Sequence, residues 1–130
     1  MIKSIELRIG NILRFDDVLS PVTAIYLDLD GVSNEVIADG NYKFMELSSG
    51  RVNGWPINED ALLSTSFKKV GDISDTVEKW SIDESRFIIY FNGKYAGLIT
   101  SLPQSVPIYY IHQLQNIYFS LIGKELSISI

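Results

Sequence analysis

Cysteine is absent from the chain, and histidine occurs only once, at His112. Without cysteine, the chain can form no disulfide framework, no thiolate nucleophile and no thiolate metal site. A single imidazole likewise excludes a histidine-rich metal site, and any catalytic triad would have to use His112. These two scarcities remove several common kinds of enzyme and metal protein from consideration.

Positive charge and long apolar runs are also scarce. The chain has 11 basic against 16 acidic residues, a net charge of -5 and a pI of about 4.7. This balance argues against a general affinity for nucleic acid or anionic membranes, although it leaves a local basic patch open. The longest strongly apolar run, residues 87–91, is far shorter than the roughly 20 residues of a membrane helix. Residues 1–8 lack the apolar segment of a secretion signal. We therefore expect a soluble, cytoplasmic protein.

The residues that are present are typical of a packed globular protein. Apolar residues make up 46% of the sequence and charged residues 21%, which is not the composition of a disordered chain. Tyrosine, phenylalanine and tryptophan supply large, stiff side chains that suit β-strands. At 130 residues, the chain has the size of one ordinary domain, or of two very small ones that share a core.

The first half of the sequence predicts a small β-barrel. Short runs of β-branched, aromatic and aliphatic residues are separated by Gly, Asn and Asp turn residues. The predicted strands cover residues 5–9, 12–15, 22–29, 35–37 and 42–47. Because closure of a sheet removes its exposed edges, we expect an SH3-like barrel over residues 1–57.

The second half predicts a short helix, then an antiparallel sheet. Asn58 is a good N-cap, and the helix after it is expected to end before Phe67. The Asn92-Gly93 pair between two aromatic-rich runs is a strong hairpin signal. The predicted strands are residues 80–82, 86–91 and 95–102, with a loop over 72–78 and a final strand over 126–130.

A C-terminal helix is predicted to cover this sheet. Apolar residues from Ile111 to Ile122 recur with helical spacing, and Gly123 is expected to stop the helix. The predicted core consists of Phe87, Ile89, Phe91, Leu98, Leu114, Tyr118 and Leu121. The expected fold is therefore β-rich α+β, in which residues 1–57 and 58–130 share one compact unit.

Three blocks of the sequence, residues 7–11, residues 56–63 with Phe67, and residues 110–126, together resemble a family of short uncharacterised proteins of anaerobic gut bacteria and their phages and prophages. Residues 110–126, YIHQLQNIYFSLIGKEL, are similar to the end of these proteins. Residues 7–11 resemble the family's start, and residues 56–63 followed by Phe67 resemble its central short helix. The resemblance implies a cytoplasmic accessory protein of mobile-element type, and it implies no reaction and no catalytic residues.

One acidic motif suggests phosphate chemistry. Asp28 and Asp30 end an apolar run as in the nucleophile strand of haloacid-dehalogenase-type phosphatases, and residues 71–75 mimic the later acidic motif of that family. Such a site needs a parallel sheet with crossovers of ~30 residues, for which the chain has no room. A Mg-dependent phosphohydrolase is therefore only a remote alternative to a strand and an Asp-Gly turn. A calcium loop that includes Asp39 fails because Gly31 is in the wrong position.

Polar and aromatic side chains provide the candidate binding residues. One side of the predicted C-terminal helix is a solvent-facing or rim stripe that caps polar groups of the sheet, or else a small recognition patch. Aromatic residues such as Trp80, Tyr42 and Tyr95 either fill the core or line a groove for a peptide or base. The candidate binding residues are His112, Gln115 and Asn116 on the helix, and Trp55 at a turn between Gly54 and Pro56.

The sequence therefore favours a non-enzymatic module that binds an unknown protein partner. No complete catalytic set is recognisable, so we assign no catalytic residue, metal ligand or cofactor. Association with a membrane is not expected. The alternative is a nucleic-acid-associated accessory protein, because small barrels also occur in nucleic-acid proteins. Salt-sensitive binding despite the acidic pI would support that alternative.

Overall fold

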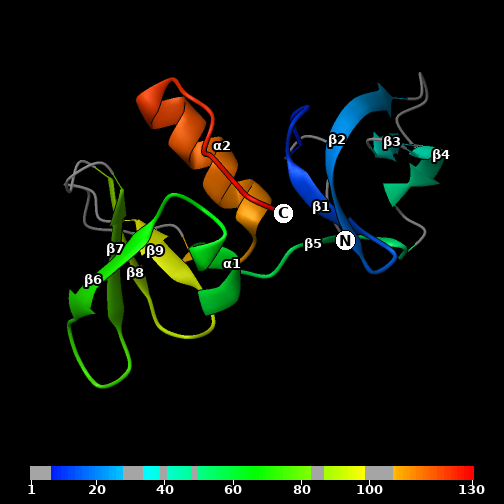
Figure 1. Cartoon of the computed structure of the whole chain (residues 1–130). Coiled ribbons are helices and arrows are strands. Elements are labelled where there is room, and N and C mark those ends of the chain that lie inside the picture. The colour runs from blue at the N-terminus through cyan, green and yellow to red at the C-terminus, as the bar shows by residue number, and fades with distance from the viewer. Residues whose placement is uncertain (1–6, 28–33, 39–40, 48–49, 83–86, 99–106) are drawn as a thin grey trace. The chain divides into compact units, whose positions relative to one another are not determined.

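The computed structural model describes residues 7–27, 34–38, 41–47, 50–82, 87–98 and 107–130. The chain divides into two compact units (Figure 1). The first unit is Met1–Trp55 together with Ile130, and the second is Pro56–Ser129. Each unit contains its own antiparallel sheet, and the second unit also contains the C-terminal helix. The predicted β-rich α+β class is therefore confirmed.

The first unit is a five-stranded antiparallel sheet with the strand order β4-β3-β2-β1-β5. The strands are β1 (Ile12–Phe15), β2 (Val18–Leu27), β3 (Asn34–Ala38), β4 (Asn41–Glu46) and β5 (Val52–Gly54). A bulge interrupts β2 between Val22 and Ala24, where its register with β3 shifts. The buried cluster consists of Leu7, Leu13, Phe15, Val22, Leu47 and Val52.

Two predictions for this unit need correction. The predicted strand over residues 5–9 is wrong for its described part, because residues 7–9 are not in a strand. The Asn11 side chain accepts a hydrogen bond from the Arg8 amide at 2.7 Å and closes a local turn there instead. The short strand β5 takes the outer position beside β1. The pairings among the described residues form an open sheet, so the structure does not show a closed SH3-like barrel.

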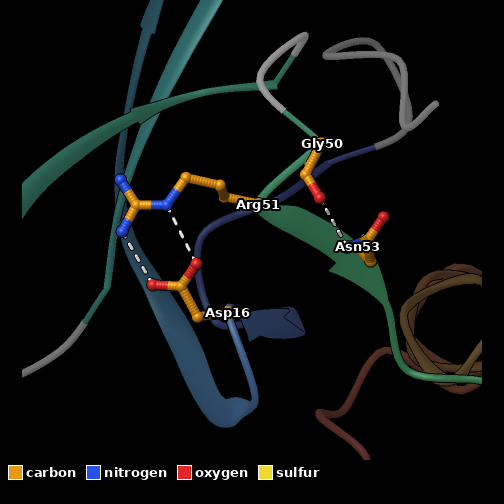
Figure 2. Close-up of polar contacts among 4 residues, drawn as sticks. All are labelled: Asp16, Gly50, Arg51 and Asn53. Atoms are coloured by element: carbon orange, nitrogen blue, oxygen red, sulfur yellow. Dashed lines mark hydrogen bonds and ion pairs between the residues drawn. The ribbon is translucent and has the colours of Figure 1, made fainter.

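An ion pair joins the β1–β2 turn to the residue before β5 (Figure 2). The Arg51 guanidinium donates two hydrogen bonds to the Asp16 carboxylate, from Nε at 2.9 Å and from Nη2 at 2.7 Å. The Asp16 amide donates in turn to the Arg51 carbonyl at 2.7 Å. Hydrogen bonding and attraction by Asp16 raise the pKa of Arg51. Both side chains are about half exposed, so this pair orders the turn more than it stabilises the fold.

The second unit contains the other five-stranded antiparallel sheet, with the order β10-β9-β8-β7-β6. Its strands are β6 (Lys68–Asp72), β7 (Glu78–Ile82), β8 (Phe87–Phe91), β9 (Ala96–Leu98) and β10 (Pro107–Ile108). The hairpin predicted at Asn92-Gly93 is present. Its central residues are Gly93, with a φ of 91°, and Lys94, while the Asn92 side chain accepts from the amides of Lys94 and Tyr95.

Helix α1 (Glu59–Leu63) begins where the sequence predicts it. The Asn58 side chain accepts a hydrogen bond from the Ala61 amide at 2.8 Å and thereby caps the helix. The predicted strand over residues 126–130 is reduced to a single bridge between Thr65 and Ile128. A hydrogen bond from the Ser129 amide to the Ser64 carbonyl, at 2.7 Å, extends this contact.

Helix α2 (Ile111–Ile122) ends at Gly123, which has a φ of 78° and donates to the Phe119 carbonyl at 2.8 Å. This left-handed cap confirms the predicted stop. Leu114 is fully buried and Tyr118 is nearly so, but Leu121 is 60% exposed. The prediction that Leu121 belongs to the core is wrong, because every residue from 119 to 125 is exposed and the last turn of α2 extends past the buried part of the helix.

The core of the second unit lies on one face of its sheet. Alternate residues of β7 and β8 are buried, and they include Trp80, Ile82, Phe87, Ile89 and Phe91. The Phe87 ring packs edge-on against Phe67 and Tyr118, with ring centroids 5.7 and 5.3 Å apart. Burial of Phe87, Ile89, Phe91, Leu114 and Tyr118 confirms most of the predicted core, whereas the side chain of Leu98 lies outside the described part.

Candidate binding surface

The outer face of the second sheet carries a row of paired residues that runs across four strands. Lys79 of β7 pairs with Tyr90 of β8, Tyr90 pairs with Gly97 of β9, and Gly97 pairs with Pro107 of β10. Because neighbouring residues of a strand point to opposite faces, this row lies opposite the buried residues of the same strands. Tyr90 is 38% exposed and Pro107 is also exposed.

A pair of tyrosines continues this surface at the end of the hairpin. Tyr95 precedes β9 and Tyr109 follows β10, and their ring centroids are 5.4 Å apart. Both residues are solvent-exposed, at 39% and 47%. The Tyr109 carbonyl accepts from the Ile57 amide at 2.9 Å, and its own amide donates to the Gln113 side chain at 2.9 Å. The backbone of this tyrosine is thus fixed although its ring is exposed.

We call this surface the tyrosine face and define it by Lys79, Tyr90, Tyr95, Gly97, Pro107 and Tyr109. Tyrosine combines a large apolar ring with a hydroxyl that can donate and accept, and it loses little conformational entropy when it is covered. Exposed tyrosines gathered on one side of a sheet form a contact surface for another molecule more readily than single scattered ones. This face therefore offers both apolar and hydrogen-bonding contacts to another molecule.

Lysines provide the charge near the tyrosine face. Lys79 belongs to it, Lys94 is exposed in the adjoining turn, and the exposed Lys68 pairs with Ser81 on the same side of the sheet. The carboxylates of Asp72 and Glu78 lie on the other side by register.

Lys69 binds both of these carboxylates. Its Nζ atom lies 3.2 Å from Asp72 Oδ1 and 3.0 Å from Glu78 Oε2. Hydrogen bonds to Glu78 and then to Asp72 raise the pKa of Lys69. The strand register therefore assigns no carboxylate of the described residues to the tyrosine face. Asp75 is an exposed acid in the loop between β6 and β7.

The candidate residues of the helix lie elsewhere in the second unit. His112 is 1% exposed and Gln115 is 3% exposed, while Asn116 is half-buried. The Tyr110 ring stacks on the imidazole, with centroids 5.6 Å apart and an angle of 16° between the planes. The expectation of a solvent-facing stripe is therefore wrong at His112 and Gln115. A binding role for these three residues stays a prediction.

Two of the four aromatic residues considered for a groove are buried. Trp55 belongs to the first unit and is 7% exposed, and Trp80 is fully buried on the inner face of the second sheet. The side chain of Tyr42 lies outside the described part. Tyr95, the fourth aromatic residue considered from sequence, is an exposed member of the tyrosine face. A binding role for Trp55 stays a prediction.

Asp28 and Asp30 of the acidic motif, and Asp39 of the calcium-loop alternative, lie outside the described residues. Within the described ranges, no three Asp, Glu or His side chains gather as a potential metal site.

The residues that sequence reasoning missed are Tyr90 and Tyr109. Strict alternation over residues 87–91 already assigns Tyr90 to the face opposite Ile89, so this signal was available.

Comparisons with protein-family models, with curated proteins and with solved structures find no match to this chain. No helix in the described part of the chain is long and apolar enough to cross a membrane.

Proposed function

We propose that this protein is a non-enzymatic binding module that docks a protein partner on its tyrosine face. The observation that carries the proposal is the exposure of Tyr90, Tyr95 and Tyr109 on one side of a sheet whose other side is the core. Tyrosine is enriched at the centres of protein interfaces and often supplies much of the binding energy there.

The test is an affinity purification of the tagged full chain from its host, without nuclease treatment. The amount of stoichiometric partner recovered with the Y90S/Y109S double variant should fall about tenfold or more. L121S changes an apolar residue on α2 that is even more exposed than the two tyrosines, so it should retain the partner and serves as the control. Thermal melting establishes that all three proteins are folded. Equal recovery of the partner by both variants would contradict the proposal.

A nucleic-acid-associated role is the second candidate, favoured by the lysines beside the exposed tyrosines. Aromatic rings with nearby cations stack unpaired bases in many single-strand-binding proteins. The net charge of -5 opposes this role. Nucleic acid that co-purifies with the protein and is released as salt is raised would favour it.

Three further attributes belong to this proposal. An SH3-like arrangement of the first unit is supported by the strand order β4-β3-β2-β1-β5 and by the bulge in β2, since a bulge lets a long strand bend round a small barrel. The resemblance of residues 110–126 supports an accessory protein of mobile-element type. The same resemblance supports a cytoplasmic location.

A further inference from the structure

We infer that the tyrosine face binds an acidic, extended segment of a partner protein, a step that rests on the proposed function. The segment crosses the strands along the row from Lys79 to Pro107. Its acidic residues meet Lys79 and Lys94, and its apolar residues lie between Tyr90 and the Tyr95–Tyr109 pair.

The length of the segment follows from the register. Lys79, Tyr90, Gly97 and Pro107 occupy four adjacent strands, so the row spans three interstrand spacings of ~4.8 Å, or about 14 Å. An extended chain rises ~3.3 Å per residue, so four or five residues of partner suffice. Gly97 adds no side chain to the row, and a partner backbone can approach the sheet there between Tyr90 and Pro107.

The charge of the segment follows from complementarity. The chain as a whole carries a net charge of -5, yet the lysines 68, 79 and 94 lie on or beside this face. Asp72 and Glu78, the acids within the strands of this sheet, are on the opposite side and bound by Lys69. An acidic ligand is therefore attracted here locally, although most of the protein repels it.

A peptide fits this distribution better than a nucleic acid does. Single-stranded nucleic acid carries a negative charge at every nucleotide, so a strand long enough to leave the face meets the repulsion of the acidic chain. A protein segment can restrict its acids to the positions next to Lys79 and Lys94. It can then present apolar residues to the tyrosine rings.

The experiment measures fluorescence anisotropy of a labelled peptide with the full-length protein. The probe has Leu-Pro-Leu-Pro at its centre and glutamates on both sides, and a second probe replaces the glutamates with lysines. Labelled oligothymidylate is the third probe. The variants are K79E, K94E and Y90S/Y109S, and K124E makes the same charge change at an exposed site beyond α2.

We expect the glutamate probe to bind more tightly than the lysine probe. K79E and K94E should each weaken its binding about fivefold, whereas K124E should leave it unchanged. Equal binding of the two peptides, failure of both to bind, or equal effects of K124E and K79E would overturn the acidic-segment inference. Tighter binding of oligothymidylate would overturn it in favour of nucleic acid. Failure of the docking proposal itself is recognised separately, since the host partner would then be retained by Y90S/Y109S.

Discussion

At the scale of single residues, Asp16 shows how a turn can use an unfavourable backbone conformation. It is the one non-glycine residue with positive φ, at 53°, among those described. Asp and Asn tolerate this left-handed region better than other residues. The bidentate contact with Arg51 gives Asp16 a second function that glycine could not perform.

Substitution of Asp16 separates these two contributions. Both D16A and D16G remove the ion pair, but only D16G relieves the left-handed backbone. We expect D16G to be more stable than D16A by about 1 kcal/mol in urea unfolding. If D16A were as stable as D16G, backbone strain at this position would not contribute.

At the scale of secondary-structure elements, local signals set the ends of the helices. Asn58 begins α1 through its side-chain cap, and Gly123 ends α2 in the left-handed conformation. The Gln113 side chain accepts from the amides of Tyr109 and Tyr110 and so satisfies donors at the start of α2. Each of these ends depends on residues close in sequence, which is why sequence patterns locate them well.

Gly123 offers a clean test of such an end. A Cβ at this position would meet no atom within 4 Å, so the cost of G123A is conformational rather than steric. We expect a loss of about 1 kcal/mol in the free energy of unfolding. G71A is the control, because Gly71 also has open space but lacks a positive φ. Equal stability of G123A and the unchanged protein would contradict the role of the cap.

At the scale of the whole molecule, each unit has a core of its own. The buried cluster around Leu13 belongs to the first sheet, and Leu114 and Tyr118 of α2 are buried with the inner face of the second. Stability of the second unit therefore depends on the middle of α2 and not on its last turn.

Two substitutions on the same helix test this dependence. L114D places a carboxylate at a position with no exposure, and we expect it to unfold at least the second unit. Its cost should exceed the ~3 kcal/mol typical of truncating a buried leucine. L121D, two turns later, lies at a 60% exposed position and should melt as the unchanged protein does. Hydrogen exchange distinguishes the two variants, because L114D should lose amide protection in the second sheet and L121D should keep it. An unchanged melting temperature for L114D would contradict the packing of α2.

Much of the fold could be predicted from sequence. The strands and the core residue that could not be predicted depend on contacts with elements distant in sequence. The strands β1, β7 and β8 and both helices have strong local patterns. The edge strands β6 and β10 have weak ones, because β6 is almost entirely exposed and β10 has two residues. Helical spacing also predicts Leu121 in the core, whereas the residue is exposed. Periodicity defines the apolar face of a helix, but not how far along the helix the neighbouring sheet extends.

The sequence by itself determined the local features of this protein, namely its turns, its helix caps, the alternation of its strands and the absence of thiol chemistry. Those depend on backbone preferences and on neighbours within a few residues. Only the tertiary structure decided that His112 and Gln115 are buried and that Tyr90, Tyr95 and Tyr109 share an exposed face. That outcome depends on the pairing of β9 with β10, which brings Tyr109 beside Tyr95. The Asn92-Gly93 hairpin signal predicts the pairing of β8 with β9, whereas no local pattern encodes the pairing of β9 with β10.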